Sequence, residues 1–401
     1  MNTNRNRNLL LVCMITLCMS CGKQSGNDAI SIENIEQLTF EKVDLVTTSM
    51  FAQEISYIPL ELRGDNLIGE IFKIIYSDST FLIGDKSKSR VYGFDSSGKW
   101  EFSIDAKGQG PGEYNELSDF YVSEGNEIHI FCRSLQKILV YDFDGNFIDE
   151  VFIRHYVNAI HHESDNKFIT YSSVSDYINT DYRPAGISAL SITNESIHNK
   201  NLISFGGDHA YSSKRQYSFF SKSQNELFIL SPSDTIFSYN SGIGLEAKYV
   251  LDFEDIKVPE RLKTLPNTVE NHQIINESGA VRLKDYFVKS RQFISFEFLL
   301  DEYVYWSFRN NDSTKMIYSY LLSDDINNFP YSAPKAIKDD DELISIITQD
   351  QWKSLLDAFI EYKKVMIENR GEEYFESNMN VLTEMIKNEQ PVLAIAKLKS
   401  N

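Results

Sequence analysis

Short runs of alternating apolar and polar residues, separated by turn residues, recur along most of the chain. Four such runs follow one another between Ile71 and Ile104, divided by polar turns such as Ser77-Asp78-Ser79. A two-residue period is typical of a strand with one buried face, and Gly, Asp and Ser at the breaks favour hairpin turns. The pattern predicts one four-stranded antiparallel sheet over residues 68–104.

The layout then repeats. The segment 91–95, Val-Tyr-Gly-Phe-Asp, resembles the segment 140–144, Val-Tyr-Asp-Phe-Asp, and their tyrosines are 49 residues apart. This spacing falls in the range of repeat lengths of β-propeller blades, each of which is a four-stranded sheet. Weaker units follow at 158–193, 217–253 and 287–347, and the N-terminal strands complete a sixth. We therefore expect an all-β fold, a six-bladed β-propeller over residues 38–347.

Several segments modify this plan. Residues 40–46 are expected to form the first strand. The strand 54–61 should lie at a sheet edge, or stop there, because Pro59 lacks the N–H that a central strand donates. A polar loop, 175–184, widens the third unit, and residues 254–284 contain prolines, charges and asparagines that indicate a partly helical insertion.

The C-terminal segment, 348–401, has a helical period instead. An apolar stripe runs from Trp352 to Met366, Gly371 is expected to end this helix, and 375–388 should form a second one. A short closing strand follows at 391–398. Because an apolar stripe is unfavourable in water, these helices and the strand should pack on the propeller as an appendage.

The N-terminal residues predict export. A basic stretch precedes an apolar run, 9–19, that is too short to cross a bilayer and is typical of a signal peptide, here residues 1–20. Residues 17–21, Leu-Cys-Met-Ser-Cys, resemble a bacterial lipobox, in which Cys21 receives lipid and becomes the mature N-terminus. Residues 21–37 then form a tether. Ordinary secretion, with Cys21 as a leftover thiol, is the alternative.

Charge and cysteine content narrow the classes of partner and site. The chain has 39 basic and 58 acidic residues, a net charge of −19, so nucleic acid and anionic lipid surfaces would be repelled. Its 22 tyrosines and 26 phenylalanines suit pleated sheets. Cys132 is the only cysteine beyond residue 21, so no internal disulfide is expected and cysteine-based metal sites are excluded.

Several motifs point to one family. They are the lipobox, the strand 55–61 (Ile-Ser-Tyr-Ile-Pro-Leu-Glu), the run 108–114 (Gly-Gln-Gly-Pro-Gly-Glu-Tyr), and segments at 233–239, 249–253 and 390–399. Together they resemble the six-bladed β-propeller lipoproteins of Bacteroidetes, whose blades are similar to NHL-type repeats. The chain departs from that family at Leu62, where a threonine is usual. The resemblance implies this fold and a cell-envelope location, and it implies no established reaction.

The glycine-rich run between the first two units is the main candidate for a binding loop. It is not a phosphate-binding loop, because no Gly-Lys-Ser/Thr follows, and its G-x-G-x-G spacing differs from the Rossmann pattern. One interpretation is structural: the glycines allow the backbone to cross between blades, and Tyr114 packs on the next blade. The other interpretation places Lys107, Gln109, Glu113 and Tyr114 around a ligand beside the central channel.

No other motif has the spacing of a catalytic or metal site. His161 and His162 are adjacent, so on a strand they would point to opposite faces, and a solvated turn is the preferred interpretation. The acidic run 339–342 lacks the spacing of a calcium loop, and Cys132 is expected to be a small core residue. We therefore expect neither a metal nor a cofactor.

The sequence favours a lipid-anchored protein of the cell envelope, at the outer membrane or facing the periplasm. Its expected role is to bind a glycan, a peptide or a partner protein without catalysis. The alternative is a propeller hydrolase or lyase whose acidic and histidine residues converge at the central channel from different blades. A third possibility is a sensor or assembly partner of an outer-membrane complex.

Overall fold

The structure is a computed structural model of the chain, and it describes residues 35–400 with internal gaps. The gaps are 64–67, 154–155, 165, 174–175, 179–180, 194–196, 206–208, 212–219, 224–225, 231–232, 328, 330, 349–350, 352–366, 368–371, 374–375 and 377–389. The signal segment, Cys21 and nearly all of the two expected C-terminal helices therefore lie outside the described residues.

Most of the described chain consists of four-stranded antiparallel sheets. The first sheet contains β4 (Ile71–Ser77), β5 (Thr80–Asp85), β6 (Arg90–Asp95) and β7 (Trp100–Ile104). The second contains β8 (Asp119–Val122), β9 (Ile128–Cys132), β10 (Lys137–Tyr141) and β11 (Phe147–Phe152). The third contains β12 (Ala159–Ser164), β13 (Lys167–Ser172), β16 (Gly186–Ile192) and β17 (Ile197–Ser204).

The fourth sheet contains β18 (Phe220–Ser223), β19 (Glu226–Leu230), β20 (Thr235–Asn240) and β21 (Gly244–Asp252). The fifth contains β22 (Arg282–Lys289), β23 (Phe293–Leu300), β24 (Tyr303–Asn310) and β25 (Lys315–Ser319). The sixth contains β27 (Ala336–Lys338), β28 (Glu342–Ile347), β29 (Val392–Leu398) and β3 (Ala52–Pro59). Strand β1 (Glu36–Lys42) pairs in parallel with both β21 and β25, so the fourth and fifth sheets form one nine-stranded sheet.

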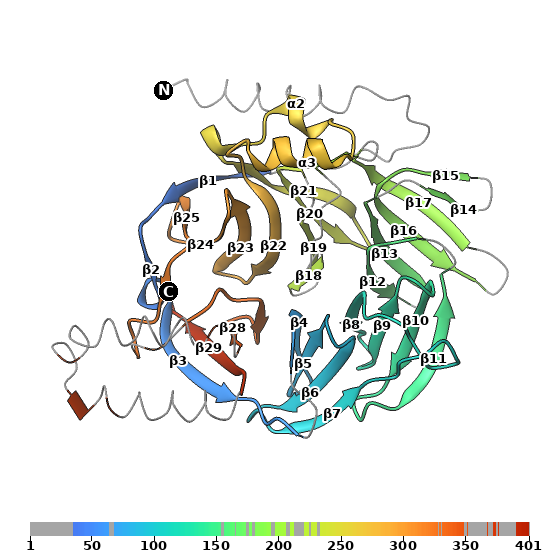
Figure 1. The fold of residues 1–401 in the computed structure, drawn as a ribbon, viewed down its shortest axis with the longest axis horizontal. Coiled ribbons are helices and arrows are strands. Elements are labelled where there is room, and N and C mark those ends of the chain that lie inside the picture. Colours follow the sequence, from blue (N-terminus) through green and yellow to red (C-terminus); the bar gives the residue numbers. More distant parts are fainter. Residues whose placement is uncertain are drawn as a thin grey trace. The chain divides into compact units, whose positions relative to one another are not determined.

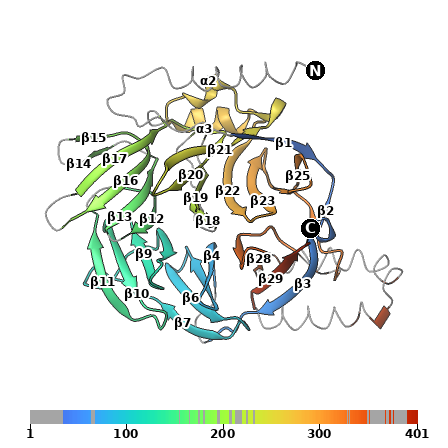
Figure 2. The ribbon, with the colours of Figure 1, turned by 180° about the vertical axis from the view of Figure 1, so that it is seen from behind.

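The first strand of each sheet lies innermost (Figure 1). These strands contact one another in a closed circuit: β4 contacts β8, β8 contacts β12, β12 contacts β18, β18 contacts β22, β22 contacts β27, and β27 contacts β4. The view from behind shows β7, β11 and β1 at the periphery (Figure 2). The expected all-β, propeller-like arrangement of small sheets is therefore present.

The core is divided among the interfaces between neighbouring sheets, which we call seams. One apolar cluster joins the first and second sheets through Phe72, Phe120 and Leu139, and another joins the fifth and sixth through Trp306, Leu343 and Ala394. Three further clusters lie between neighbouring sheets: one between the sixth sheet and the first, one between the second sheet and the third, and one between the fourth sheet and the fifth. Both faces of most sheets are therefore buried, which explains why strands such as β5, β9 and β10 are buried throughout.

The sixth sheet is built from both terminal regions. Strand β29 pairs with β28 on one side and with β3 on the other, so residues 392–398 are an integral strand of this sheet. Strand β3 is the edge of the sheet and ends at Pro59. This confirms the prediction that the proline marks an edge strand or its end, because the edge position requires no N–H from that residue.

Three local expectations differ from the structure. The first strand is β1, residues 36–42, because its partners are the distant strands β21 and β25. The expected loop 175–184 contains a hairpin of β14 (Asp176–Ile178) and β15 (Asp181–Arg183). Strand β22 begins at Arg282, inside the expected insertion.

The segment between β21 and β22 contains short helices, η2 (Glu254–Ile256), α2 (Glu260–Lys263) and α3 (Val269–Asn276). The side chain of Thr268 caps α3 by accepting a hydrogen bond from the Asn271 amide. Two short elements follow β1: β2 (Val46–Thr47), which pairs with β26 (Leu322–Ser323), and η1 (Thr48–Met50). Among the residues that the structure describes, no helix is both long enough and apolar enough to cross a membrane.

Candidate functional site

The glycine-rich loop connects the outer strand of the first sheet, β7, to the inner strand of the second, β8. Backbone hydrogen bonds close the loop on itself: the Tyr114 amide donates to the Ala106 carbonyl at 2.8 Å, and the Gly108 amide donates to the Tyr114 carbonyl at 3.2 Å. The Glu113 carboxylate accepts a further hydrogen bond from the Gly110 amide at 2.9 Å. The loop is therefore a compact structure with its own internal bonding.

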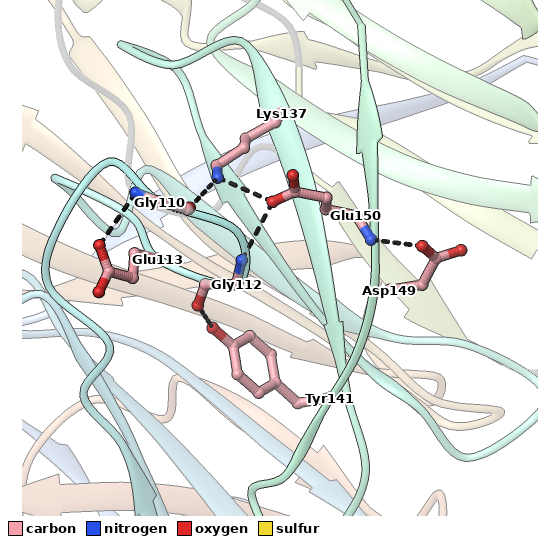
Figure 3. A network of polar contacts seen from close by, with 7 residues as sticks. All are labelled: Gly110, Gly112, Glu113, Lys137, Tyr141, Asp149 and Glu150. Atoms are coloured by element: carbon pink, nitrogen blue, oxygen red, sulfur yellow. Dashed lines mark hydrogen bonds and ion pairs between the residues drawn. The ribbon is translucent and has the colours of Figure 1, made fainter.

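A partly buried ion pair fastens this loop to the second sheet (Figure 3). The Lys137 ammonium donates to the Gly110 carbonyl at 3.1 Å and to the Glu150 carboxylate at 2.8 Å. The same carboxylate accepts from the Gly112 amide at 3.2 Å, and the Tyr141 hydroxyl donates to the Gly112 carbonyl at 2.9 Å. Lys137, Tyr141 and Glu150 belong to β10 and β11, the two outer strands. The glycines therefore lie against the outer half of the second sheet and not against its innermost strand β8.

The electrostatics of this contact keep its charges in place. Burial alone would raise the pKa of Glu150, but the hydrogen bonds from Lys137 and from the Gly112 amide lower it below its ordinary value. Burial and the nearby Glu150 raise the pKa of the Tyr141 hydroxyl. Glu150 is consequently ionised and Tyr141 protonated at neutral pH, which is the pattern that the observed donors and acceptors require.

The four residues predicted to bind a ligand differ in exposure. Lys107, Gln109 and Glu113 are exposed on the loop surface. Tyr114 is fully buried in the seam between the first and second sheets, where its hydroxyl donates to the Ile104 carbonyl at 2.9 Å. Burial raises the pKa of that hydroxyl, so Tyr114 is a neutral core residue. The structural role that the sequence suggested for Tyr114 is therefore the one observed.

Lys137 and Glu150, which hold the loop, were not recognisable from the sequence. They are 13 residues apart on neighbouring strands, and neither has a motif around it. A lysine at the start of an apolar strand is the only local signal, because a buried charge requires a partner.

Polar residues also meet at the seams, some on inner strands and others on the strands and turns behind them. Lys73 on β4 pairs with Asp119 on β8 at 2.8 Å, and the Tyr239 hydroxyl donates to Glu163 on β12 at 2.9 Å. The remaining contacts are Lys284 with Asp234 at 4.0 Å, Lys335 with Glu297 at 3.3 Å, Lys338 over the Tyr76 ring at 5.1 Å, and the ring stack of Tyr121 and His129 with His162. These polar contacts thus join neighbouring sheets to each other.

Two of these contacts contain deeply buried charges. Burial lowers the pKa of Lys284, an effect that Asp234 opposes and Lys263 reinforces, while the Lys284 ammonium also donates to the Tyr211 hydroxyl at 3.3 Å. Burial raises the pKa of Glu297, and Lys335 opposes that change. Tyr286, beside them on β22, has a φ of 51°, and the Lys335 ammonium lies 3.6 Å from the centroid of its ring. These groups are packed components of the seams.

The histidine pair is the clearest correction to the sequence analysis. His161 and His162 lie on strand β12 and not in a solvated turn, because both residues pair with β13. His162 stacks against His129 at 5.4 Å between ring centroids and against Tyr121 at 6.1 Å. His161 lies 6.2 Å from the Phe220 ring on β18, in the fourth sheet. Rings from other sheets surround the pair, which sequence spacing does not reveal.

His129 is part of a polar chain. Its Nδ1 lies 3.1 Å from the Tyr121 hydroxyl and its Nε2 lies 3.3 Å from the Glu127 carboxylate. Burial, reinforced by the nearby His162 and opposed by Glu127, lowers the pKa of His129 to about 4. His129 is therefore neutral at neutral pH, so the Nε2 hydrogen is donated to Glu127 and Nδ1 accepts from Tyr121.

Cys132 is buried and belongs to the cluster between the first and second sheets, as expected for a small core residue. In the described part of the chain, no group of three His, Cys, Asp or Glu side chains is arranged to hold a metal ion. A shallow depression of about 350 Å³ lies where both terminal regions meet the first sheet, lined by Pro59, Glu61, Ser97, Gly98, Lys99 and Gln390.

The fold and its contacts define a class of protein, an all-β, propeller-like chain of small sheets joined at polar and apolar seams. Residues 30–397 match the model of one family, described as a domain of unknown function, DUF4934. The chain belongs to the DUF4934 family. No curated protein sequence gives a significant match.

A crystal structure of a putative exported protein from Bacteroides fragilis is similar in fold, with a TM-score of 0.71 at 16% identity over 92% of this chain and 100% of that one. A DUF4221-family protein from Bacteroides vulgatus gives a TM-score of 0.49 at 10% identity over 87% of this chain and 97% of that one. Virginiamycin B lyase from Staphylococcus aureus gives 0.36 at 12% identity over 73% and 81%. The first of these supports the fold alone.

Gly112→Ala should destabilise the protein, because Gly112 has a φ of 71° and an added Cβ would lie 3.0 Å from the Phe147 ring. We expect the free energy of unfolding to fall by about 1–2 kcal/mol, the cost of a left-handed non-glycine residue. Urea unfolding of the purified chain measures this. Gly110→Ala is the matched control, since its Cβ would meet only the flexible Glu113 carboxylate, at 3.1 Å. Equal losses in both variants would contradict a conformational requirement specific to Gly112.

Acid should weaken the seam that contains His129. A histidine with a lowered folded-state pKa binds fewer protons than the unfolded chain, so its contribution is complete above its ordinary pKa of 6.5 and is lost as the pH falls toward about 4. The loss should reach about 3 kcal/mol at most, since one pKa unit is worth about 1.4 kcal/mol. Unfolding measured between pH 7 and 4.5 should show a shallower pH dependence for His129→Gln than for the parent. Parallel curves would show that His129 does not carry the effect.

Proposed function

We propose that this protein is an exported, lipid-anchored six-bladed β-propeller of the cell envelope, with NHL-like blades, that binds a glycan, a peptide or an envelope protein without catalysing a reaction. The closed circuit of six innermost strands supports the blade count. The signal-like N-terminus, the lipobox at Cys21 and the fold shared with a putative exported protein of Bacteroides fragilis support the location.

The observation that carries the non-catalytic role is the use of the inner-strand charges. An enzyme of this fold would need acids, bases or nucleophiles that reach a substrate at the channel. Here Lys73 on β4, Asp119 on β8 and Glu163 on β12 are engaged in contacts between sheets. Side chains that hold two sheets together cannot exchange protons with a substrate without disturbing the seam.

The hydrolase or lyase alternative has one geometric argument, the chain Glu127, His129 and Tyr121, which resembles a carboxylate-imidazole-hydroxyl relay. Its terminal hydroxyl does not suit the role. Tyr121 is 3% exposed, and burial, with Asp119 and Glu127 nearby, raises its pKa well above the ordinary value. A hydroxyl that is both inaccessible and hard to ionise makes a poor nucleophile or base, so binding remains the better supported role.

Metabolic labelling with a palmitate analogue tests the anchor. Label should enter the parent protein and be absent from a Cys21→Ala variant, which should be recovered from the soluble exported fraction. The matched control is Cys132→Ala, because Cys132 is buried and should not affect labelling. Equal labelling of the parent and of Cys21→Ala would refute lipidation at this residue.

Separating binding from turnover tests the role. The purified full-length chain, incubated with panels of polysaccharides and peptides, should retain a ligand that is recovered unchanged in mass. The enzymatic alternative would be established instead if products of hydrolysis or of an elimination reaction appeared with the parent protein and were not formed by the His129→Gln variant.

A further inference from the structure

An aromatic ladder crosses the fifth sheet from the core to the solvent. Tyr305 stacks on Phe298 with 5.7 Å between ring centroids, and Tyr320 lies edge-on to Tyr305 at 5.5 Å. Tyr303 completes the series at 5.1 Å from Tyr320. Phe298 and Tyr305, where the ladder starts, belong to the buried cluster between the fourth and fifth sheets. Tyr303 and Tyr320, where it ends, lie outside that cluster.

The two terminal rings are open to solvent on a fixed support. Tyr303 is 57% exposed and Tyr320 is 43% exposed, whereas Tyr305 behind them is only 4% exposed. The backbone on both sides of Tyr320 is fixed, because the Ser319 hydroxyl donates to the Asp44 carbonyl at 3.1 Å and accepts from the Leu321 amide at 3.1 Å. The Leu321 carbonyl in turn accepts from the Val46 amide at 3.0 Å. A ligand would therefore meet a fixed backbone at Tyr320, which limits the ordering that binding requires.

Polar groups border these rings. The Lys42 ammonium, on β1, lies 3.5 Å from the Tyr305 hydroxyl and 5.4 Å from the centre of its ring. The Tyr303 and Tyr320 hydroxyls add two groups that both donate and accept. Leu45 and Leu321 are also exposed, and the Val46 amide bonded to the Leu321 carbonyl keeps their two segments together. We call Tyr303, Tyr320, Lys42, Leu45 and Leu321 the aromatic platform; it lies where β24, β25 and the end of β1 meet (Figure 1).

We propose that the aromatic platform binds a neutral, pyranose-containing glycan, which deepens the binding role proposed above and rests on it. A pyranose ring has an apolar C–H face and a rim of hydroxyls. Two tilted tyrosine faces match the first, while the Lys42 ammonium and the tyrosine hydroxyls match the second.

Charge argues for a neutral glycan. Asp44 and Glu302 are exposed next to platform residues along the chain, and the whole protein has a net charge of −19. One lysine does not outweigh that field for a uronate or sulfate polymer. The number of hydroxyls at the platform also exceeds what an apolar peptide segment would need, so a peptide ligand is an outcome of the test and not the proposal.

Affinity gel electrophoresis of the purified full-length chain tests the platform, with starch-type α-glucan, β-glucan, mannan or xylan in the gel and polygalacturonate as the anionic comparison. At least one neutral polysaccharide should retard the protein. Tyr303→Ala and Tyr320→Ala should each weaken the affinity about fivefold or more, as expected when one aromatic contact is removed. Tyr303→Phe, which keeps the ring, should retain most of it. Phe152→Ala removes a half-exposed aromatic ring from β11, in the second sheet, and should change nothing.

Each other result overturns the inference. If both alanine variants were still retarded like the parent, the platform would not be the binding site, although the protein would still bind glycans. Retardation by polygalacturonate alone would contradict the charge argument. If no polysaccharide retarded the chain and a peptide bound, the platform proposal would fail and the general binding role would stand. If neither bound and products were released instead, both the platform proposal and the non-catalytic binding role would be refuted.

Discussion

Face-to-face packing between neighbouring sheets is the constraint on which the structure depends. A twisted four-stranded sheet with two apolar faces needs a partner on each face, and the closed circuit of inner strands supplies both. The apolar clusters therefore lie in the seams and not in one central core. Each seam also has a polar contact near the centre, such as Lys73 with Asp119, which fixes the alignment of sheets that apolar contact alone would let slide.

The glycine-rich loop is best understood as part of one seam. It passes from the first sheet to the second, and the ion pair of Lys137 and Glu150 holds its backbone against β10 and β11. Side-chain bulk at Gly112 would push the loop away from Phe147. The composition of the run thus follows from a close backbone approach under a buried charge, and no anion is needed to explain it.

The same constraint shapes where a ligand could bind. Lys73, Asp119 and Glu163 on inner strands are engaged between sheets, so we look for recognition where the packing ends. At the fifth sheet an aromatic ladder runs out of the core, leaving Tyr303 and Tyr320 about half exposed. Strand β1 contributes Lys42 to that edge, while the parallel pairing of β1 joins two sheets.

The sequence by itself determined the strands and the repeat. Alternation and turn residues located β4 to β11 closely, because a half-buried hairpin leaves a local pattern. Pro59 marked an edge, and Cys132 was recognised as a core residue. For Tyr114 the sequence left core packing and ligand binding both open, and the structure places it in the core. The tertiary structure decided which distant segments meet. It places β1 between β21 and β25 and β29 beside β3. It also brings His129 to His162, and Lys137 and Glu150 to Gly110 and Gly112. These depend on pairing across tens to hundreds of residues, and no local period encodes which sheet edge or ring a side chain will meet. The physical reason is that the hydrophobic period of a strand shows which of its faces is buried, whereas the packing of the whole chain determines which strand or ring that face contacts.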